Sequence, residues 1–245
     1  MLPDFFHVGS AKCASTWLWQ VCKEHPEIFV PLHNYDNVNF FTVRYHKGLD
    51  WYEQTYFAEY DGEPRVGEFS NSYMVYRPAM ERIARHLPDA QLTMILRDPV
   101  ETIFLGWAQT YLKGRIAEHP ECWRELAFIL DHHGHAFYRL FAEGLFYARH
   151  LKNIYAHFPR ERVLVMIYDD LCSDPGAFLE RFFSFLGVDS AFRPQMLDKD
   201  VNPDTFGTDR GRYVSDGLMD ELREMYRPDV EELEELIDRD LSHWR

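Results

Sequence analysis

The stretch that decides the fold is FFHVGSAKCASTWL, residues 5–18. Residues 5–8 are apolar and predict a strand, a short loop of small residues follows, and a helix is predicted over 15–24. A strand that enters a helix through such a loop forms an anion site, because backbone N–H groups and the helix dipole point at the ligand. The sequence therefore predicts a loop that binds phosphate or a group of similar shape, with Lys12 as a mobile cation.

The lysine of this loop is displaced from the position that an ATP-binding Walker A loop requires. Walker A, G-x-x-x-x-G-K-[ST], places the lysine directly before the hydroxyl residue. Counted from Gly9, that position holds Ser15, whereas Lys12 lies in the middle of the loop. The displaced lysine argues against a P-loop small-molecule kinase. A dependence of activity on ATP and magnesium would argue for one.

The displaced lysine resembles the 5′-phosphosulfate loop of the sulfotransferases, whose pattern is roughly G-x-x-K-[AST]-[GA]-[ST]-[ST]. The resemblance implies a sulfuryl donor, 3′-phosphoadenosine 5′-phosphosulfate (PAPS), and a catalytic role for Lys12. A strand–helix turn with an incidental lysine is the alternative. The donor contacts that the resemblance implies extend over the whole loop: Gly9, Ser10, Ala11, Lys12, Cys13, Ala14, Ser15 and Thr16.

Strand and helix patterns alternate along the chain. Such alternation predicts a P-loop-like α/β/α fold in three layers, with a mainly parallel sheet covered on both faces. A last helical pattern, 215–242, is expected to break at Pro228. Strands are predicted at 5–8, 66–68, 92–96 and 163–167, and helices at 15–24, 77–86, 100–112, 136–157 and 177–186.

Length and composition limit the class of protein. The chain has 245 residues and is expected to form a single domain, 1–245. Its net charge of −14 argues against nucleic acid or an anionic membrane as partner. No apolar run approaches the roughly 20 residues of a membrane span. The first residues do not resemble a signal peptide, so a cytoplasmic location is expected.

Cysteine and histidine spacing predicts neither a disulfide framework nor a metal site. The four cysteines form no C-x-x-C pair and are expected to be free thiols. His132, His133 and His135 lie close together, but no H-E-x-x-H or similar ligand spacing occurs. We expect no metal.

An arginine follows the predicted strand 92–96 in the sequence LTMILRDPVETIF. Ligands of parallel sheets bind beyond the carboxyl ends of the strands, and an arginine fork suits a phosphate there. The segment resembles the sulfotransferase pattern R-x-P-x-x-R-x-x-S, which implies that Arg97 binds the donor's 3′-phosphate. The second arginine of that pattern falls on Thr102, a weaker substitute, and the serine falls on Leu105. The alternative is that Arg97 pairs with Asp98 or a helix end.

A basic loop lies near the C-terminus, in FGTDRGRYVS. Two arginines around a glycine indicate either a solvated surface or a flap over an anion. Bacterial and carbohydrate sulfotransferases carry a basic, glycine-containing loop that closes over the nucleotide. By this resemblance, Arg210, Gly211 and Arg212 are predicted to bind the donor.

The sequence VGEFSNSYMVY contains the candidate general base. It resembles the E-K-[ST]-x-x-Y segment of the glycosaminoglycan sulfotransferases, which implies that Glu68 is the catalytic base. A carboxylate that ends an apolar strand is costly to bury unless it is paired or functional. The alternatives are that Glu68 pairs with Arg65, Arg97 or a helix N-terminus, or that His7 or His33 is the base.

Aromatic residues cluster in VNFFTVRYHKGLDWYEQTYF, which resembles the K-E-x-x-F-F…G-x-x-W-Y segment of the family. The lysine of that pattern, which helps neutralise the sulfuryl group, falls on Asp36, and the glutamate falls on Asn37. The charge of the missing lysine would then have to come from Lys12, together with Lys47 or an arginine. Residues predicted to contact the acceptor are His33, Phe40, Phe41, Trp107 and Tyr111, with a place in the core as the alternative for most aromatic residues.

Together these segments resemble the PAPS-dependent sulfotransferases, in their bacterial, heparan-sulfate-sulfotransferase-like branch. The resemblance implies in-line transfer of a sulfuryl group to a hydroxyl or amine of a small-molecule or carbohydrate acceptor, without a metal. The acidic net charge favours a small neutral or cationic acceptor over heparan sulfate. Because Asp36 and Leu105 replace the lysine and the serine of the family patterns, a non-catalytic protein that still binds the nucleotide is an alternative. Oligomeric state is not predicted.

Overall fold

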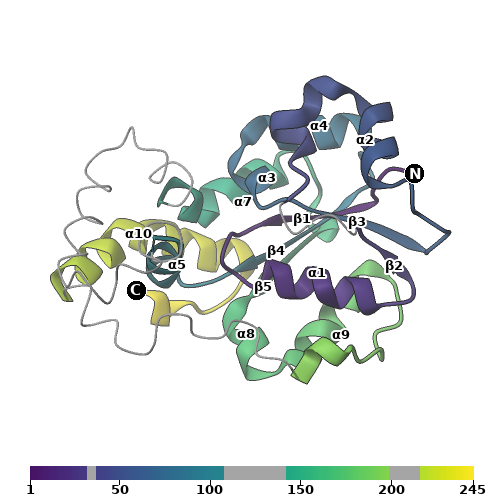
Figure 1. The fold of residues 1–245 in the computed structure, drawn as a ribbon. Helices are drawn as coiled ribbons and strands as arrows, with labels where there is room; N and C mark the ends of the chain where they lie inside the picture. The colour runs from purple at the N-terminus through teal and green to yellow at the C-terminus, as the bar shows by residue number, and fades with distance from the viewer. Residues whose placement is uncertain (32–36, 108–141, 199–215) are drawn as a thin grey trace, which may run out of the picture. The chain divides into compact units, whose positions relative to one another are not determined.

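The computed structural model describes residues 1–31, 37–107, 142–198 and 216–245 (Figure 1). The chain divides into two compact units. The first comprises Met1–Leu96 with Lys152–Val201, and the second comprises Arg97–Leu151 with Asn202–Arg245. That the whole chain is one domain stays a prediction.

The first unit is built on a five-stranded sheet in the order β2-β3-β1-β4-β5, in which every neighbouring pair is parallel. The parallel α/β prediction is therefore confirmed, and all four predicted strands are present. β2 was not predicted because a strand of two residues carries no periodic signal. The strands are β1 (Phe5–Gly9), β2 (Ile28–Phe29), β3 (Arg65–Phe69), β4 (Gln91–Leu96) and β5 (Val163–Ile167).

Helices cover both faces of this sheet (Figure 1). One face carries α1 (Ser15–Glu24), α8 (Tyr168–Ser173) and α9 (Pro175–Leu186). The other carries α2 (Leu49–Tyr56), α3 (Ser72–Val75) and α4 (Arg77–His86). Shorter turns complete the unit: η2 (Phe40–Arg44), η3 (Tyr45–Lys47), η7 (Arg160–Arg162) and η8 (Gln195–Asp198).

The alternation of side chains along β1 builds a separate core on each face. Phe5 packs edge-on against Phe182 of α9, with ring centroids 6.4 Å apart. The next residue, Phe6, points to the opposite face and contacts Phe41 and Tyr73, at 5.8 and 6.2 Å. Both β1 rings are fully buried, so the strand that leads into the anion loop is fixed from both sides.

The second unit contains α5 (Pro99–Trp107), η6 (Glu143–Leu145), α10 (Asp216–Ile237) and η10 (Ser242–Trp244), and α7 (Tyr147–Tyr155) begins in it. The described part of the helix predicted over 136–157 is interrupted, which corrects that prediction. A 3-10 turn at η6 precedes α7, and Asp229 of α10 accepts hydrogen bonds from the N–H groups of Ala148 and Arg149, at 2.9 and 3.2 Å. These two donors of the first helical turn are thereby satisfied from another helix.

The expected break at Pro228 was also wrong, because α10 runs through this residue. A proline within a helix loses one hydrogen bond and costs about 3 kcal/mol. The buried side chains of Tyr226, Val230 and Leu233 flank it, and burial of each large apolar side chain contributes about 1.5–3 kcal/mol. Packing therefore outweighs the local cost of the proline.

Among the described residues, no helix combines the length and the apolar character needed to cross a bilayer. Cys22 and Cys172 are free thiols, as predicted.

Candidate active site

The loop between β1 and α1 has the backbone of an anion site. Lys12 and Ala14 adopt left-handed conformations, with φ of 66° and 63°. The N–H of Ser10 donates to the carbonyl of Ile95 in β4 at 2.9 Å, which fixes the start of the loop to the neighbouring strand. Ala14 is the N-cap of α1 and supplies no side-chain cap, so the N–H groups of the first turn face the loop without one.

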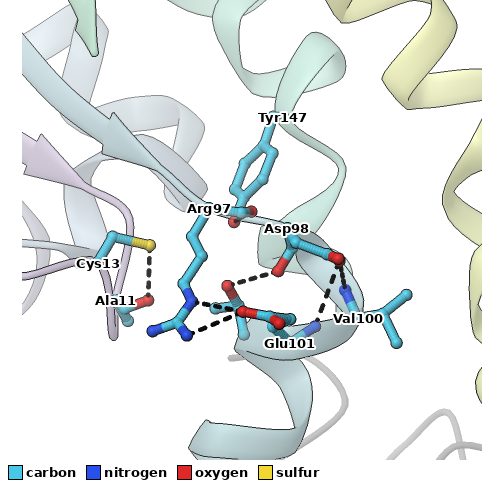
Figure 2. A network of polar contacts seen from close by, with 8 residues as sticks. Ala11, Cys13, Arg97, Asp98, Val100, Glu101 and Tyr147 are labelled. Atoms are coloured by element: carbon cyan, nitrogen blue, oxygen red, sulfur yellow. Dashed lines mark hydrogen bonds and ion pairs between the residues drawn. The ribbon is translucent and has the colours of Figure 1, made fainter. Parts of the chain in front are cut away.

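Gly9 is required where the chain leaves β1. Its φ is +156°, and a Cβ built on it would lie 3.1 Å from Cβ of Met74 in α3. Ser10 and Cys13 are buried, and the Cys13 thiol donates to the carbonyl of Ala11 at 3.4 Å (Figure 2). The small residues of the loop thus allow a close backbone approach to a ligand.

Lys12 is half-buried, and burial lowers the pKa of its ammonium group below the ordinary value. A partly desolvated cation interacts more strongly with an anion than an exposed one does, because the surrounding dielectric is lower. An anion beside Lys12 would therefore meet a more strongly interacting charge than at the open surface.

Asn71 joins the anion loop to the carboxyl end of β3, and sequence reasoning missed it. Its side-chain amide donates to Oγ of Ser15 at 3.1 Å, and its backbone N–H donates to Oδ1 of Asn37 at 2.9 Å. Its position in the sequence could have identified it, because Asn71 follows β3 by two residues and ligands of parallel sheets bind beyond the carboxyl ends of the strands.

Glu68 lies near the end of β3 and is fully buried. Its Oε2 accepts hydrogen bonds from the hydroxyls of Tyr73, at 2.9 Å, and Tyr52, and its Oε1 accepts one from the hydroxyl of Ser70. Burial raises the pKa of Glu68 to about 7, against the smaller lowering effects of the three hydroxyls and of Arg44. The carboxyl group therefore titrates near neutrality, as a general base requires.

Among the described residues, the hydrogen-bond partners of the Glu68 carboxylate are hydroxyls, whereas Arg65 bonds Asp4 at 2.9 Å. His7, the rival base in β1, is fully buried, stacks on Phe69 at 5.0 Å, and has one ring nitrogen, Nδ1, 3.2 Å from Oγ1 of Thr93. Burial lowers the pKa of His7 to about 3. A histidine with so low a pKa is a weak base, so the two pKa values favour Glu68 over His7. His33 lies outside the described residues.

Arg97, the first residue after β4, belongs to a hydrogen-bonded turn at the start of α5 (Figure 2). Its Nε and Nη2 donate to Oε2 of Glu101, at 3.1 and 2.8 Å, and Tyr147 donates its hydroxyl proton to the Arg97 carbonyl at 3.1 Å. Asp98 caps α5 by accepting the N–H of Val100 at 2.8 Å. The arginine fork is thus held in place by a glutamate four residues on, and the alternative pairing with Asp98 is not observed.

Thr102 contributes its hydroxyl to the same turn. The side chain is fully buried and donates to the Asp98 carbonyl at 2.8 Å. The prediction that Thr102 contacts a phosphate therefore receives no support from the structure, because its one hydroxyl proton is used within the helix.

Phe40 and Phe41 are fully buried in the core between η2, α2 and α3. Phe40 stacks on Tyr52, with centroids 4.1 Å apart and planes inclined by 8°. Their predicted contact with an acceptor receives no support, because neither ring has exposed surface. The remaining predicted residues lie outside the description: Tyr111, Arg210, Gly211, Arg212 and the side chain of Trp107.

Within the described ranges, no three His, Cys, Asp or Glu side chains are grouped so as to hold a metal ion. His132, His133 and His135 fall outside those ranges, so the expectation of a metal-free protein stays a prediction.

Comparison with known proteins decides the family. The sequence pattern of the sulfotransferase domain matches residues 2–231. The chain belongs to the sulfotransferase domain family. A solved sulfotransferase structure from Alicyclobacillus acidocaldarius has 27% sequence identity and a TM-score of 0.81, with 100% of this chain and 99% of that chain covered. The predicted family and fold are thereby confirmed.

Similar sequences among characterised sulfotransferases include enzymes of heparan sulfate. The mouse heparan sulfate glucosamine 3-O-sulfotransferase 3A1 is 26% identical over 266 residues, which cover 98% of this chain and 64% of that protein. The human heparan sulfate glucosamine 3-O-sulfotransferase 6 is 28% identical over 247 residues, covering 92% and 69%. The chain thus spans a little under two thirds of the length of the first of these relatives.

Proposed function

We propose that this chain is a PAPS-dependent sulfotransferase that transfers a sulfuryl group to a hydroxyl or amine of a carbohydrate or small-molecule acceptor. The observation that carries the proposal is the loop 9–16. In a chain of the sulfotransferase family, this loop presents a half-buried lysine and an uncapped helix N-terminus immediately after the central strand β1.

The residues present fit the donor's charged groups. The N–H groups at the start of α1, with the hydroxyls of Ser15 and Thr16, would hold the 5′-phosphate, because a helix N-terminus favours an anion. Lys12 would bind the oxygens that gain negative charge during transfer. When bound, PAPS supplies the sulfuryl group and an adenosine bisphosphate leaving group.

Arg97 is the residue of this chain that would hold the 3′-phosphate, as the family pattern implies. Binding there requires the guanidinium to share or exchange its contact with Glu101, whose Oε2 lies 2.8 Å from Nη2. An Arg–carboxylate pair preorganises the fork but competes with a phosphate. The basic residues Arg210 and Arg212 would then add further positive charge, as predicted from the sequence.

Glu68 would accept the proton that the acceptor loses. The acceptor O–H bond would break, with the proton moving to the Glu68 carboxylate and the electron pair staying on the acceptor oxygen. That oxygen would bond the sulfur as the bond between sulfur and the donor's bridging oxygen breaks, and the departing 5′-phosphate would keep the electron pair of the broken bond. A pKa of about 7 keeps much of Glu68 ionised near neutral pH and lets it bind a proton readily. Because Glu68 has no exposed surface in this structure, an acceptor reaches it only when the side chains around the carboxyl group move.

The acceptor class follows from charge and family. The mouse relative described above is named as a sulfotransferase of heparan sulfate, which is a polyanion. This chain, in contrast, carries a net charge of −14. Repulsion between like charges lowers the affinity and association rate of a polyanion. We therefore propose an acceptor with little negative charge, such as a neutral sugar or a small-molecule alcohol.

The experiment that tests this proposal follows the sulfuryl group directly. PAPS carrying labelled sulfur is incubated with the protein and a panel of neutral sugars, amines, phenols and heparan sulfate, and labelled product is separated and counted. Label in a neutral or cationic acceptor supports the proposal. Donor binding by calorimetry without transfer to any acceptor would indicate a non-catalytic relative, and transfer confined to heparan sulfate would refute the acceptor class.

A further inference from the structure

The buried Glu68 carboxylate is bonded unequally at its two oxygens. Among the described residues, Oε2 receives two tyrosine hydroxyls, from Tyr52 of α2 and Tyr73 of α3, whereas Oε1 receives the single hydroxyl of Ser70. A carboxylate oxygen offers two lone-pair positions. Oε2 is therefore saturated, and Oε1 keeps one position for a further donor.

The direction of two of these hydroxyls is fixed by the backbone. The N–H of Phe41 donates to the hydroxyl oxygen of Tyr73 at 3.1 Å, and the N–H of Asn39 donates to Oγ of Ser70 at 2.8 Å. Because each hydroxyl oxygen already accepts a hydrogen bond from a backbone amide, the hydroxyl presents its own proton to Glu68. Two chains of hydrogen bonds thus run from residues 39–41 through a hydroxyl to the carboxylate, and chains of this kind strengthen each member.

The same short segment holds the tyrosine rings. Phe40 stacks on Tyr52 at 4.1 Å, and Phe41 packs edge-on against Tyr73 and Tyr52, each at 5.8 Å. Arg82 of α4 fixes the segment from behind, since its Nη1 donates to the carbonyls of Phe41 and Thr42, at 2.6 and 3.3 Å. The two phenylalanines therefore position the hydroxyls that position the carboxylate.

We propose that Tyr52 and Tyr73 are positioning residues that fix Oε2 of Glu68, and that Oε1, on the side of Ser70, is the oxygen that takes the acceptor's proton. This inference rests on the proposed role of Glu68 as the base. In this arrangement the acceptor hydroxyl occupies the second position on Oε1 or replaces Ser70, while the tyrosine pair keeps the carboxylate oriented.

In the part of the chain that the structure describes, few ionisable groups surround this site. Tyr52 and Tyr73 face the carboxylate, Arg44 at the end of η2 acts on it at longer range, and Tyr56 acts on Tyr52. Each tyrosine hydroxyl stabilises the ionised form of Glu68, so its removal favours the protonated form. Loss of a hydrogen bond to a charged group corresponds to a rise of about one unit in the protonation midpoint.

The test compares Tyr52→Phe and Tyr73→Phe with Tyr45→Phe in the full chain. Tyr45 is a matched control, because its ring packs on Phe40 and Phe41 while its hydroxyl bonds His86 at 2.8 Å. Two readouts are taken: infrared titration of the Glu68 carboxyl stretch, assigned as the band that Glu68→Gln removes, and the pH dependence of kcat/KM for transfer. We expect both midpoints to rise by about one unit in Tyr52→Phe and Tyr73→Phe, with kcat about tenfold lower, KM unchanged and no shift in Tyr45→Phe.

Unshifted infrared midpoints in both tyrosine variants would overturn the inference, as would an equal shift in the control. Failure of the proposed function is recognised separately. If Glu68→Gln retains transfer, Glu68 is not the base and the assignment of the proton to Oε1 falls with it. The infrared titration then still decides whether the tyrosines hold the carboxylate.

Discussion

Phe40 offers the sharpest contrast between a core role and a role in acceptor binding. The Phe40 ring is fully buried and contacts the rings of Tyr52, Phe41 and Tyr45, at centroid distances of 4.1, 4.9 and 5.9 Å. Phe40→Ala removes this ring and leaves a cavity that the surrounding aromatic side chains fill only in part. Changes of this kind cost about 3–5 kcal/mol, of which each aromatic pair accounts for about 0.5–1.5 kcal/mol.

Urea unfolding of wild type and Phe40→Ala measures this loss, and Val43→Ala is the control within the same turn. Val43 is 67% exposed, so its truncation should change the free energy of unfolding by less than about 0.5 kcal/mol. A loss below about 1 kcal/mol in Phe40→Ala, together with a raised KM for the acceptor, would refute the core assignment and restore the acceptor contact predicted from the sequence.

Two further predictions concern stability. Burial raises the pKa of Glu68 from 4.5 to about 7, so its contribution to stability is complete below pH 4.5 and is lost as the pH rises to about 7, a loss of about 3 kcal/mol. Thermal unfolding across this range should show that loss in wild type and a flatter profile in Glu68→Gln, and parallel profiles would contradict the buried, ionisable carboxyl. Asp229→Ala should cost about 1–2 kcal/mol, because the first turn of α7 loses two backbone partners. Asp220→Ala on the exposed side of α10 should cost less than about 0.5 kcal/mol in the same unfolding assay, and equal losses would contradict the capping role of Asp229.

The alternation of apolar strands and helical patterns was enough to predict the parallel sheet and the bounds of α1 and α4. Packing between segments that are distant in the sequence could not be predicted from such local patterns. Pro228 was predicted to break its helix because a local rule was applied where buried neighbours decide. The two-residue β2 was missed because it is too short to show a period.

The site was predicted in part, for a similar reason. The loop around Lys12 is a local motif, so its place between a strand and a helix was predicted, whereas the left-handed conformations of Lys12 and Ala14 were not. The ion pair between Arg97 and Glu101 was not predicted, because the sequence pointed to Asp98 or a helix end as the partner of Arg97. The partners of Glu68 were not predicted either, because Tyr52 lies 16 residues away and reaches the carboxylate only through tertiary packing.

The central claim is that Lys12 carries the charge of the transferring sulfuryl group. The most direct measurement is transfer of labelled sulfur from PAPS by Lys12→Ala, compared with Lys47→Ala, which removes the rival lysine in η3. Loss of a group that stabilises developing charge costs at least about 100-fold in kcat. We predict that Lys12→Ala abolishes transfer while the fold and the activity of Lys47→Ala are retained. Transfer by a folded Lys12→Ala protein within about tenfold of wild type would contradict the account.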